Sequence, residues 1–223
     1  MGSRAVTLAT KKQVGNPKVT PSFWDEACKQ LIKKDRVMKR LIPQFGDACL
    51  QTRGDAFVTL ARSIVGQQIS VKAAQTVWDR FAVLPKKITP AAILKLKVDD
   101  MRAAGLSARK VEYLVDLALH FDSGALHIDA WKSMDDEEII DELVGIRGIG
   151  RWTAEMFLIF HLMRPNVLPL DDVGLINGIS LNYFSGEVVS RSEVREVAAA
   201  WAPFCSVATW YIWRSLDPQP VAY

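Results

Sequence analysis

A glycine-rich segment in the middle of the chain has the residue types of an anion-binding turn. It contains Gly145, Gly148 and Gly150, and it joins two segments with helical periodicity. Glycine tolerates positive φ and close approach of another backbone, so several N–H groups can converge on one anion, helped by the N-terminus of the following helix. A DNA phosphate is the natural ligand for such a turn.

Two other interpretations of this segment are possible. A glycine loop before a helix could bind a dinucleotide, but that fold needs a strand before the loop, and residues 135–144 have the pattern of a helix. We therefore set that interpretation aside. A purely structural turn between two helices stays open from the spacing alone.

Two neighbouring carboxylates follow further along the chain. Asp171 and Asp172 come directly after Leu168-Pro169-Leu170 and before an apolar helix. Either side chain could cap that helix and complement its dipole. Capping is the favoured interpretation for Asp171.

The elements that must position these residues are all predicted to be helices. Strand signals are nearly absent, whereas helical periodicity with start and stop signals recurs along the chain, so we expect an all-α fold. Asp55, Ser70 and Ser107 have the positions of helix caps. We expect helices over residues 23–34, 36–42, about 56–66, 71–81, 99–104, 108–121, 134–144, 151 to about 163, roughly 192–200 and roughly 206–216. We also expect a short helix opened by Thr89-Pro90 and another that starts at Asp171 or Asp172.

The composition suits a globular protein. Apolar residues make up 49% of the 223 residues and the net charge is +3, which permits a nucleic-acid partner without requiring one. Residues 1–20 are largely polar and are expected to form a loose tail. No stretch approaches the roughly 18 apolar residues of a membrane helix, so we expect a cytoplasmic protein, associated with the nucleoid if bacterial.

Cysteine and histidine usage argues against a metal centre. The three cysteines lie far apart, and the three histidines have no ligand-like spacing with them. We therefore expect reduced thiols, no iron–sulfur cluster and no metal held by side chains.

The glycine-rich segment and the carboxylates together resemble one enzyme family. Residues 145–154, Gly-Ile-Arg-Gly-Ile-Gly-Arg-Trp-Thr-Ala, and residues 168–172, Leu-Pro-Leu-Asp-Asp, are similar to the helix-hairpin-helix DNA glycosylases, specifically DNA-3-methyladenine glycosylase II. The resemblance covers roughly residues 55–216. The combined motif is far more specific than either part.

The resemblance implies an architecture. It implies two all-helical lobes with a DNA-binding cleft between them, one lobe from residues 21–54 and about 166–223, the other from about 55–165 with the hairpin. It also implies a monovalent cation, Na⁺ or K⁺, at hairpin carbonyls such as those of Gly145 and Gly148. No other cofactor is expected.

The same resemblance assigns the chemistry to Asp172, which matches the family's catalytic aspartate. A carboxylate near the sugar can stabilise an oxocarbenium-like transition state or orient water. A purine alkylated at N3 or N7 is cationic and departs as a neutral base, so it needs little acid assistance. One carboxylate can then suffice.

The resemblance also implies a pocket for an extruded base. Trp152 and Trp213 match the family's pocket aromatics, and an indole face attracts a cationic base by about 0.5–2 kcal/mol. Met156 lies one helical turn beyond Trp152, where other members often have tyrosine. Core packing is expected of the other tryptophans, namely Trp24, Trp78, Trp131, Trp201 and Trp210.

Further DNA contacts are implied at three places. Gln68, in the turn of residues 66–70, matches the wedge that fills the space left by the extruded base; from spacing alone this turn need only end one helix and cap the next. Ser107, Arg109 and Lys110 resemble a phosphate-contacting turn, although the two cations equally fit a solvated face. Arg151 follows the hairpin and is grouped with it.

The sequence also departs from the family pattern. A basic residue usual near Cys205 is missing, and no role is predicted for Glu155. Trp152 stands where bifunctional relatives have a lysine, and an indole nitrogen cannot form an imine with the sugar, so a hydrolytic, monofunctional enzyme is expected.

The expected partner is double-stranded DNA with alkylated bases, bound by a monomer. A glycosylase for oxidised or mismatched bases and a non-catalytic DNA-binding module remain as alternatives. The iron–sulfur branch of the former needs four clustered cysteines, and this chain has three.

Overall fold

The fold is all-helical, as the sequence predicts. A computed structural model describes residues 20–52 and 54–217, and every regular element in those ranges is a helix. The tail expected over residues 1–20 lies outside the described residues except for Thr20. The helices are α1 (Trp24–Lys34), α2 (Arg36–Leu41), the short 3-10 helix η1 (Ile42–Phe45), α3 (Ala56–Gly66), α4 (Val71–Ala82), α5 (Pro90–Ile93), α6 (Val98–Ala103), α7 (Ala108–Asp122), α8 (Asp136–Val144), α9 (Arg151–Phe160), α10 (Val173–Tyr183), α11 (Arg191–Ala198) and α12 (Cys205–Leu216).

Most predicted boundaries agree with these bounds within two residues, because the caps are local signals. Asp55, Ser70 and Ser107 each accept a hydrogen bond from a first-turn backbone N–H, as predicted. α9 is the exception, because it ends at Phe160 instead of Met163. Met163 has φ +55°, and a proline follows Arg164, so the chain leaves the helical conformation earlier than the apolar pattern suggests.

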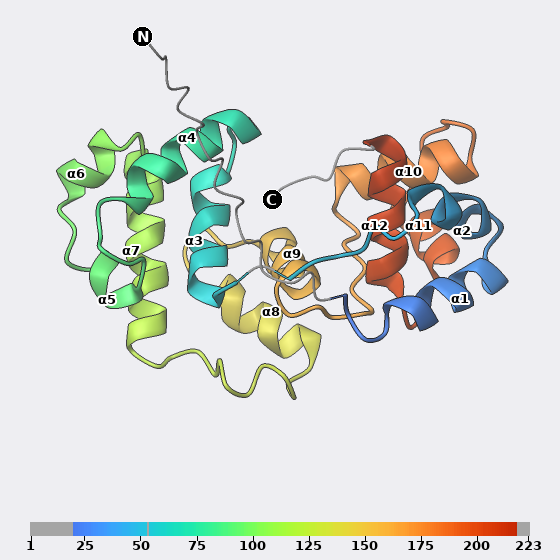
Figure 1. The fold of residues 1–223 in the computed structure, drawn as a ribbon, viewed down its shortest axis with the longest axis horizontal. Coiled ribbons are helices and arrows are strands. Elements are labelled where there is room, and N and C mark those ends of the chain that lie inside the picture. Colours follow the sequence, from blue (N-terminus) through green and yellow to red (C-terminus); the bar gives the residue numbers. More distant parts are fainter. Residues whose placement is uncertain (1–19, 53, 218–223) are drawn as a thin grey trace, which may run out of the picture.

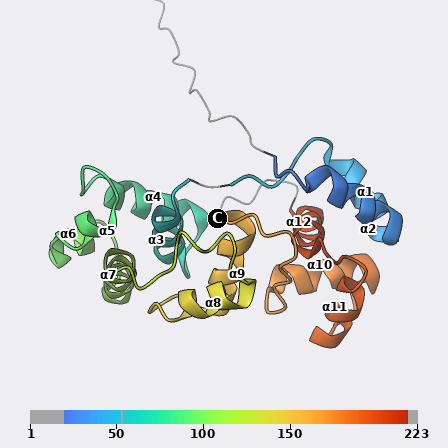
Figure 2. The ribbon, with the colours of Figure 1, turned by 90° about the horizontal axis from the view of Figure 1, so that it is seen from below.

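The helices form two lobes (Figure 1). In one lobe α1, α2 and α10 pack against α12, and α11 packs against α10. In the other lobe α7 packs against α3, α5 and α6, and α4 packs against α3. α8 and α9 pack against each other in the middle, where α9 also contacts α3 (Figure 2).

The chain crosses between the lobes twice. The first crossing lies between η1 and α3, and the second lies between α9 and α10 (Figure 1). The N-terminal helices therefore share a lobe with the three C-terminal helices. Buried apolar side chains from both lobes form one continuous core, which includes Trp24, Trp78, Trp131 and Trp201 as expected.

No helix within residues 20–52 and 54–217 has the length and apolar character needed to cross a membrane. Cys28, Cys49 and Cys205 are free thiols.

A buried carboxylate joins the helices of the first lobe. Asp35 is 8% exposed, and its Oδ1 accepts hydrogen bonds from the backbone N–H groups of Val37 (2.7 Å) and Met38 (2.9 Å), which caps α2. Its Oδ2 accepts from the Tyr183 hydroxyl of α10 (2.8 Å) and from Trp201 Nε1 (3.2 Å). One side chain thus fixes α2 to α10 and to the segment before α12.

We predict that Asp35→Ala lowers the free energy of unfolding by about 2–4 kcal/mol, because it removes a cap, leaves the Tyr183 hydroxyl without its acceptor and leaves Trp201 Nε1 with only its contact to that hydroxyl. Urea denaturation followed by circular dichroism measures this change. The exposed Asp47 provides the control, and Asp47→Ala should stay within about 0.5 kcal/mol of the parent protein. Equal stability of the two variants would contradict the role given to Asp35.

Candidate active site

Asp172 lies where three helices meet. Its Oδ1 accepts hydrogen bonds from the backbone N–H of Leu175 (2.6 Å) and from Trp213 Nε1 of α12 (2.7 Å). Its Oδ2 accepts from Trp152 Nε1 of α9 (2.8 Å). The side chain is only 7% exposed, so its position is set by α9, α10 and α12 together.

The helix cap at this place is Asp172, and the expectation that Asp171 serves as the cap was wrong. Asp172 has an extended backbone conformation directly before Val173, the first residue of α10, and this is the geometry of an N-cap. Asp171 comes one residue too early. Its side chain is half-exposed and forms an ion pair with Arg191.

The carboxylate of Asp172 keeps room for one more donor. Oδ1 already accepts two hydrogen bonds, whereas Oδ2 accepts one, and a carboxylate oxygen can accept two. A water molecule or another donor can therefore bind at Oδ2. A rigidly held carboxylate of this kind can stabilise a neighbouring positive charge or orient a nucleophilic water.

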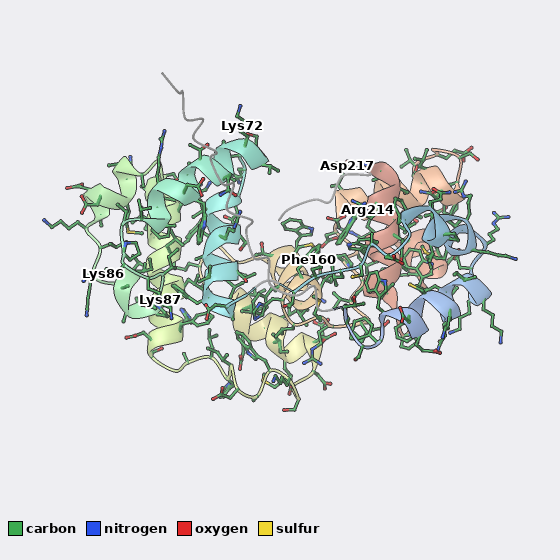
Figure 3. The ribbon with its side chains drawn as sticks, viewed as in Figure 1. Lys72, Lys86, Lys87, Phe160, Arg214 and Asp217 are labelled. Atoms are coloured by element: carbon green, nitrogen blue, oxygen red, sulfur yellow. The ribbon has the colours of Figure 1, made fainter. Side chains whose placement is uncertain are left out.

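α9 presents an apolar face beside this carboxylate. Trp152, Met156 and Phe160 are spaced four residues apart, so they lie on one face of the helix. Phe160 lies between the two lobes (Figure 3) and stacks on Trp213, with ring centroids 5.8 Å apart and planes 12° from parallel. The stack holds the indole that donates to Asp172.

A cavity of about 520 Å³ separates α9 and the hairpin from α3 and α4. Five of the predicted site residues line it, and they come from the turn after α3, from the hairpin and from α9. Trp152 retains 38% exposure there. The five residues are Gln68, Gly148, Gly150, Trp152 and Met156.

Trp213 occupies a different place from the other pocket residues. It is buried, its ring is stacked on Phe160, and its indole N–H points to Asp172. It is not among the described residues that line the 520 Å³ cavity. The structure therefore places Trp213 behind Asp172, in contact with the carboxylate.

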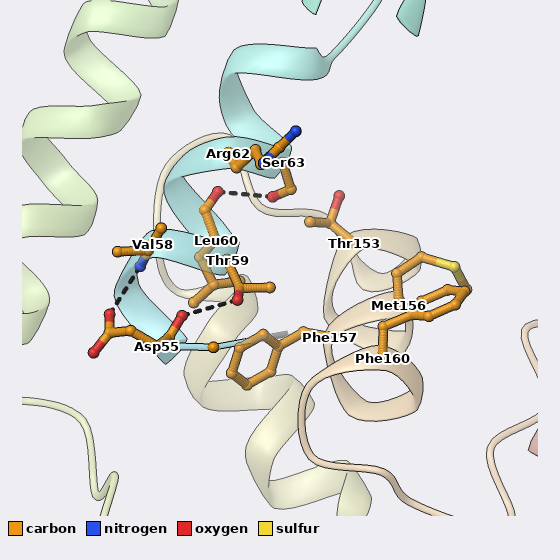
Figure 4. A pocket seen from close by; sticks show the side chains of 11 residues that line it. Asp55, Val58, Thr59, Leu60, Arg62, Ser63, Thr153, Met156, Phe157 and Phe160 are labelled. Carbon is orange, nitrogen blue, oxygen red and sulfur yellow. Dashed lines mark hydrogen bonds between the residues drawn. The ribbon is translucent and has the colours of Figure 1, made fainter. Parts of the chain in front are cut away.

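A second cavity of about 420 Å³ adjoins the first between α3 and α9 (Figure 4). Asp55, the N-cap of α3, lines it on one side with Val58 and Thr59 of α3, and Phe157 and Phe160 of α9 line it on the other. The two cavities meet along a boundary formed by two residues of α3 and two of α9. These shared residues are Arg62, Ser63, Thr153 and Met156.

The three hairpin glycines have three different conformations. Gly148 alone has positive φ (+86°), and a Cβ built there would lie 2.2 Å from the ring of Tyr113. Gly145 is helical (φ −60°) and ends α8, and Gly150 is extended (φ −94°) and precedes α9. Positive φ, which glycine allows at all three positions, is thus adopted at Gly148 alone of the three.

Gly150 leaves the N-terminus of α9 open. It is exposed and has no side chain to accept from the first-turn N–H groups of α9. Helix N-termini of this kind bind anions through their N–H groups and the helix dipole. This is the geometry that a phosphate-binding hairpin requires.

The hairpin is fixed to its neighbours by polar contacts. The backbone N–H of Arg147 donates to Asp116 Oδ2 (2.8 Å), and its guanidinium donates to Glu112 Oε2 (3.1 Å), both on α7. On the other side, Gln67 Nε2 donates to the carbonyl oxygen of Gly148 (2.8 Å).

This last contact bears on the expected cation. Gly148 was one of two predicted carbonyl ligands, and its oxygen accepts a hydrogen bond from Gln67. A carbonyl oxygen has two lone pairs, so a monovalent cation at the carbonyls of Gly145 and Gly148 stays a prediction. The described residues contain no group of three or more His, Cys, Asp or Glu side chains that could hold a metal ion.

The Arg151 guanidinium is held by two carboxylates, one from α8 and one from α9. Its Nη1 donates to Glu137 of α8 (2.9 Å), and its Nε donates to Glu155 of α9 (3.1 Å). Burial raises the pKa of Glu155, against the opposing charge of Arg151. Glu155 thus acquires a structural role as the partner of Arg151, and the Arg151 guanidinium is only partly available for a phosphate.

The predicted contacts at the start of α7 lie outside both cavities. Ser107 caps α7, and Arg109 is exposed. Lys110 Nζ donates to the carbonyl oxygen of Val65 (2.7 Å), near the end of α3, and burial lowers the pKa of this amine. Lys110 therefore supports the C-terminus of α3, just before the turn that contains Gln68.

Two residues of this region were missed by the sequence analysis. Arg62 lines both cavities, with its guanidinium 5.7 Å from the Trp78 ring centroid, and it donates to Gln75. Gln67 lies beside the predicted Gln68, and residue types alone do not tell which of two neighbouring glutamines turns inward.

Comparisons with known proteins agree with this geometry. The model of the family described as HhH-GPD superfamily base excision DNA repair protein matches residues 61–203. The chain is 32% identical to DNA-3-methyladenine glycosylase 1 of Schizosaccharomyces pombe over 195 residues, covering 86% of this chain and 82% of the relative.

Solved structures give the same result. A DNA-3-methyladenine glycosidase from Bacillus halodurans superposes with a TM-score of 0.80 at 34% identity, covering 86% of this chain and 89% of that one. The Schizosaccharomyces pombe 3-methyladenine DNA glycosylase in complex with abasic DNA superposes with a TM-score of 0.74 at 31% identity, covering 89% of this chain and 100% of that one. The chain therefore belongs to the HhH-GPD superfamily of base-excision DNA repair proteins, in which the DNA-3-methyladenine glycosylases are its relatives.

Proposed function

We propose that this protein is a monofunctional DNA glycosylase that removes alkylated purines, of the 3-methyladenine and 7-methylguanine type, from double-stranded DNA. It hydrolyses the N-glycosidic bond and leaves an abasic site. The observation that carries the proposal is the carboxylate of Asp172, which two indoles and a helix N-terminus hold next to the cavity lined by Trp152. The protein acts as a monomer on the DNA of the cytoplasm.

The reaction needs one carboxylate. As the bond between C1′ and the cationic purine breaks, its electron pair goes to the base, which leaves neutral, and positive charge grows on the sugar. Asp172 stabilises that charge, and water then adds to C1′ and releases its proton toward Oδ2 or solvent. The hydrogen bonds from Trp152, Trp213 and Leu175 keep the carboxylate from turning away during this step.

Recognition of the damaged base rests on the exposed part of Trp152. Its indole N–H is committed to Asp172, so the orientation of the ring is fixed and its exposed surface faces the cavity. A cationic purine gains attraction from such a face that a neutral purine lacks. Met156 completes this wall of the cavity with an adaptable side chain.

In this proposal the hairpin binds the DNA backbone, and the turn after α3 inserts a side chain into the duplex. The open N-terminus of α9 at Gly150 offers N–H groups to a phosphate. Gln68 is exposed at the tip of the turn, with φ +58°, and lines the same cavity. In this position it can occupy the space that the extruded nucleotide leaves in the duplex.

We predict that Asp172→Asn lowers the single-turnover rate of 7-methylguanine release by at least roughly 100-fold, because the substitution removes the charge that stabilises the transition state. Asparagine is itself a good N-cap, so α10 should remain capped. Affinity for an abasic-site analogue should change by no more than about threefold, because that ligand has no departing base.

The neighbouring aspartate supplies the matched control. Asp171→Asn loses an exposed ion pair with Arg191 and should keep a rate near that of the parent protein. Parental turnover by the Asp172 variant would refute the proposed mechanism.

We predict that Gly150→Val weakens binding to undamaged duplexes by about tenfold. The loss should be the same for every sequence, because phosphate contacts carry no sequence information. A Cβ at this position meets no atom within 4 Å, so the fold should persist, and the valine stands in front of the N–H groups of α9. Fluorescence anisotropy on several duplexes measures the affinity, which should also fall with rising salt concentration.

Gly148→Val gives the contrasting variant. Its side chain would overlap the ring of Tyr113 at a residue with φ +86°, so the protein should melt at a lower temperature. If a folded Gly150→Val protein kept the DNA affinity of the parent protein, the hairpin would be only a structural turn and not a phosphate-binding site.

We predict that sodium borohydride does not trap a covalent complex of this protein with damaged DNA and that the damaged strand stays intact. An imine needs a free amine near the sugar, and the described residues that line the two cavities include no lysine. The Lys110 amine donates a hydrogen bond to the carbonyl oxygen of Val65. Efficient trapping, or strand breaks at the rate of base release, would overturn the hydrolytic mechanism.

A further inference from the structure

A side-chain amide connects the turn after α3 to the hairpin. We call residues 66–70 the tip turn and residues 145–150 the hairpin. Gln67 Nε2, in the tip turn, donates to the carbonyl oxygen of Gly148, in the hairpin, at 2.8 Å, across 81 residues of sequence. Both residues line the 520 Å³ cavity.

The backbone of the tip turn separates the two glutamines. Gln67 is extended (φ −56°, ψ 134°), and Gln68 has φ +58°. The change of conformation between them sends one side chain to the hairpin and leaves the next residue exposed. Positive φ is unfavourable for a residue with a side chain, and Gln68 is flanked by two fixed residues that help to maintain it: Gln67, bonded to Gly148, and Ser70, which caps α4.

The acceptor is as firmly placed as the donor. Gly148 has φ +86°, and the Tyr113 ring leaves no room for a side chain at this residue; the backbone conformation directs its carbonyl oxygen. The preceding residue, Arg147, is hydrogen-bonded through its backbone to Asp116. The Gln67 amide therefore bonds to a fixed point of the hairpin.

From this contact we infer that Gln67 is a positioning residue for base extrusion. It holds the tip turn at a set distance from the hairpin, so that Gln68 enters the duplex at a fixed place relative to the phosphate bound at α9. The inference rests on the proposed function for the roles of Gln68 and the hairpin. The Gln67 amide donates to the Gly148 carbonyl, so the role that we assign to it acts through Gln68.

The test is a double-mutant cycle with Gln67→Met and Gln68→Ala. Methionine has about the length of glutamine and cannot donate to Gly148. Extrusion is followed by the fluorescence of 2-aminopurine placed beside the lesion, and base release is followed in single turnovers. Gln67→Met alone should slow extrusion and release by about tenfold, while affinity for undamaged duplex stays within about twofold.

The decisive arm is the Gln68→Ala background. If Gln67 acts by placing Gln68, adding Gln67→Met there should change the extrusion rate by less than about twofold. Equal effects in both backgrounds, or no effect in either, would overturn the inference. Gln67→Glu, which keeps the shape of the side chain but places a carboxylate oxygen against the Gly148 carbonyl, should slow extrusion at least as much as Gln67→Met.

A failure of the proposed function would look different. The parent protein would then release no alkylated base, whereas the 2-aminopurine signal would still show whether Gln67→Met slows extrusion. Should Gln67→Met melt far below the parent protein, Gln67→Glu supplies the same comparison. A parental extrusion rate in either folded variant contradicts the role of Gln67.

Discussion

Three N–H groups converge on the Asp172 carboxylate, and the arrangement of the two lobes follows from that convergence. One donor belongs to the helix that Asp172 caps, and the other two are indoles from α9 and α12. α9 packs with α8 and α3, and α12 packs with α10, α1 and α2, so the carboxylate joins helices that otherwise belong to different halves of the molecule. A buried acceptor of this kind loses much of its value if any one donor moves away.

Asp172 therefore has a stabilising and a chemical role at once. Capping and the two indole contacts hold the side chain in one orientation, and Oδ2, which accepts one hydrogen bond from the described residues, has the capacity to accept a second. Trp152 is equally shared, because its N–H serves the carboxylate and its exposed surface serves the cavity. Such sharing preorganises the site, since neither group has to move before the bond breaks.

Local signals made most of the fold predictable. Caps such as Asp55, Ser70 and Ser107 fix where helices begin, and these depend on neighbouring residues alone. The resemblance singled out Asp172 and the hairpin in the same way, through short motifs.

Features that depend on distant partners were not predictable. Asp171 and Asp172 have the same side chain, and only the backbone conformation decides which one caps α10. Gln67 and Gln68 differ in the sign of φ. Arg151 donates to the carboxylate of Glu137, which lies 14 residues away in α8. Periodicity carries no information on such contacts, because it describes one helix at a time.

The connectivity of the lobes has a consequence for synthesis on the ribosome. Helices α3 to α9 form a continuous stretch of chain and can pack as soon as they have emerged. α1 and α2 emerge before these helices, yet both pack against α12, which emerges after them. During translation the apolar faces of α1 and α2 therefore stay exposed until α12 has been made, so that this lobe, with the capping carboxylate of Asp172, is completed after the lobe of α3 to α7.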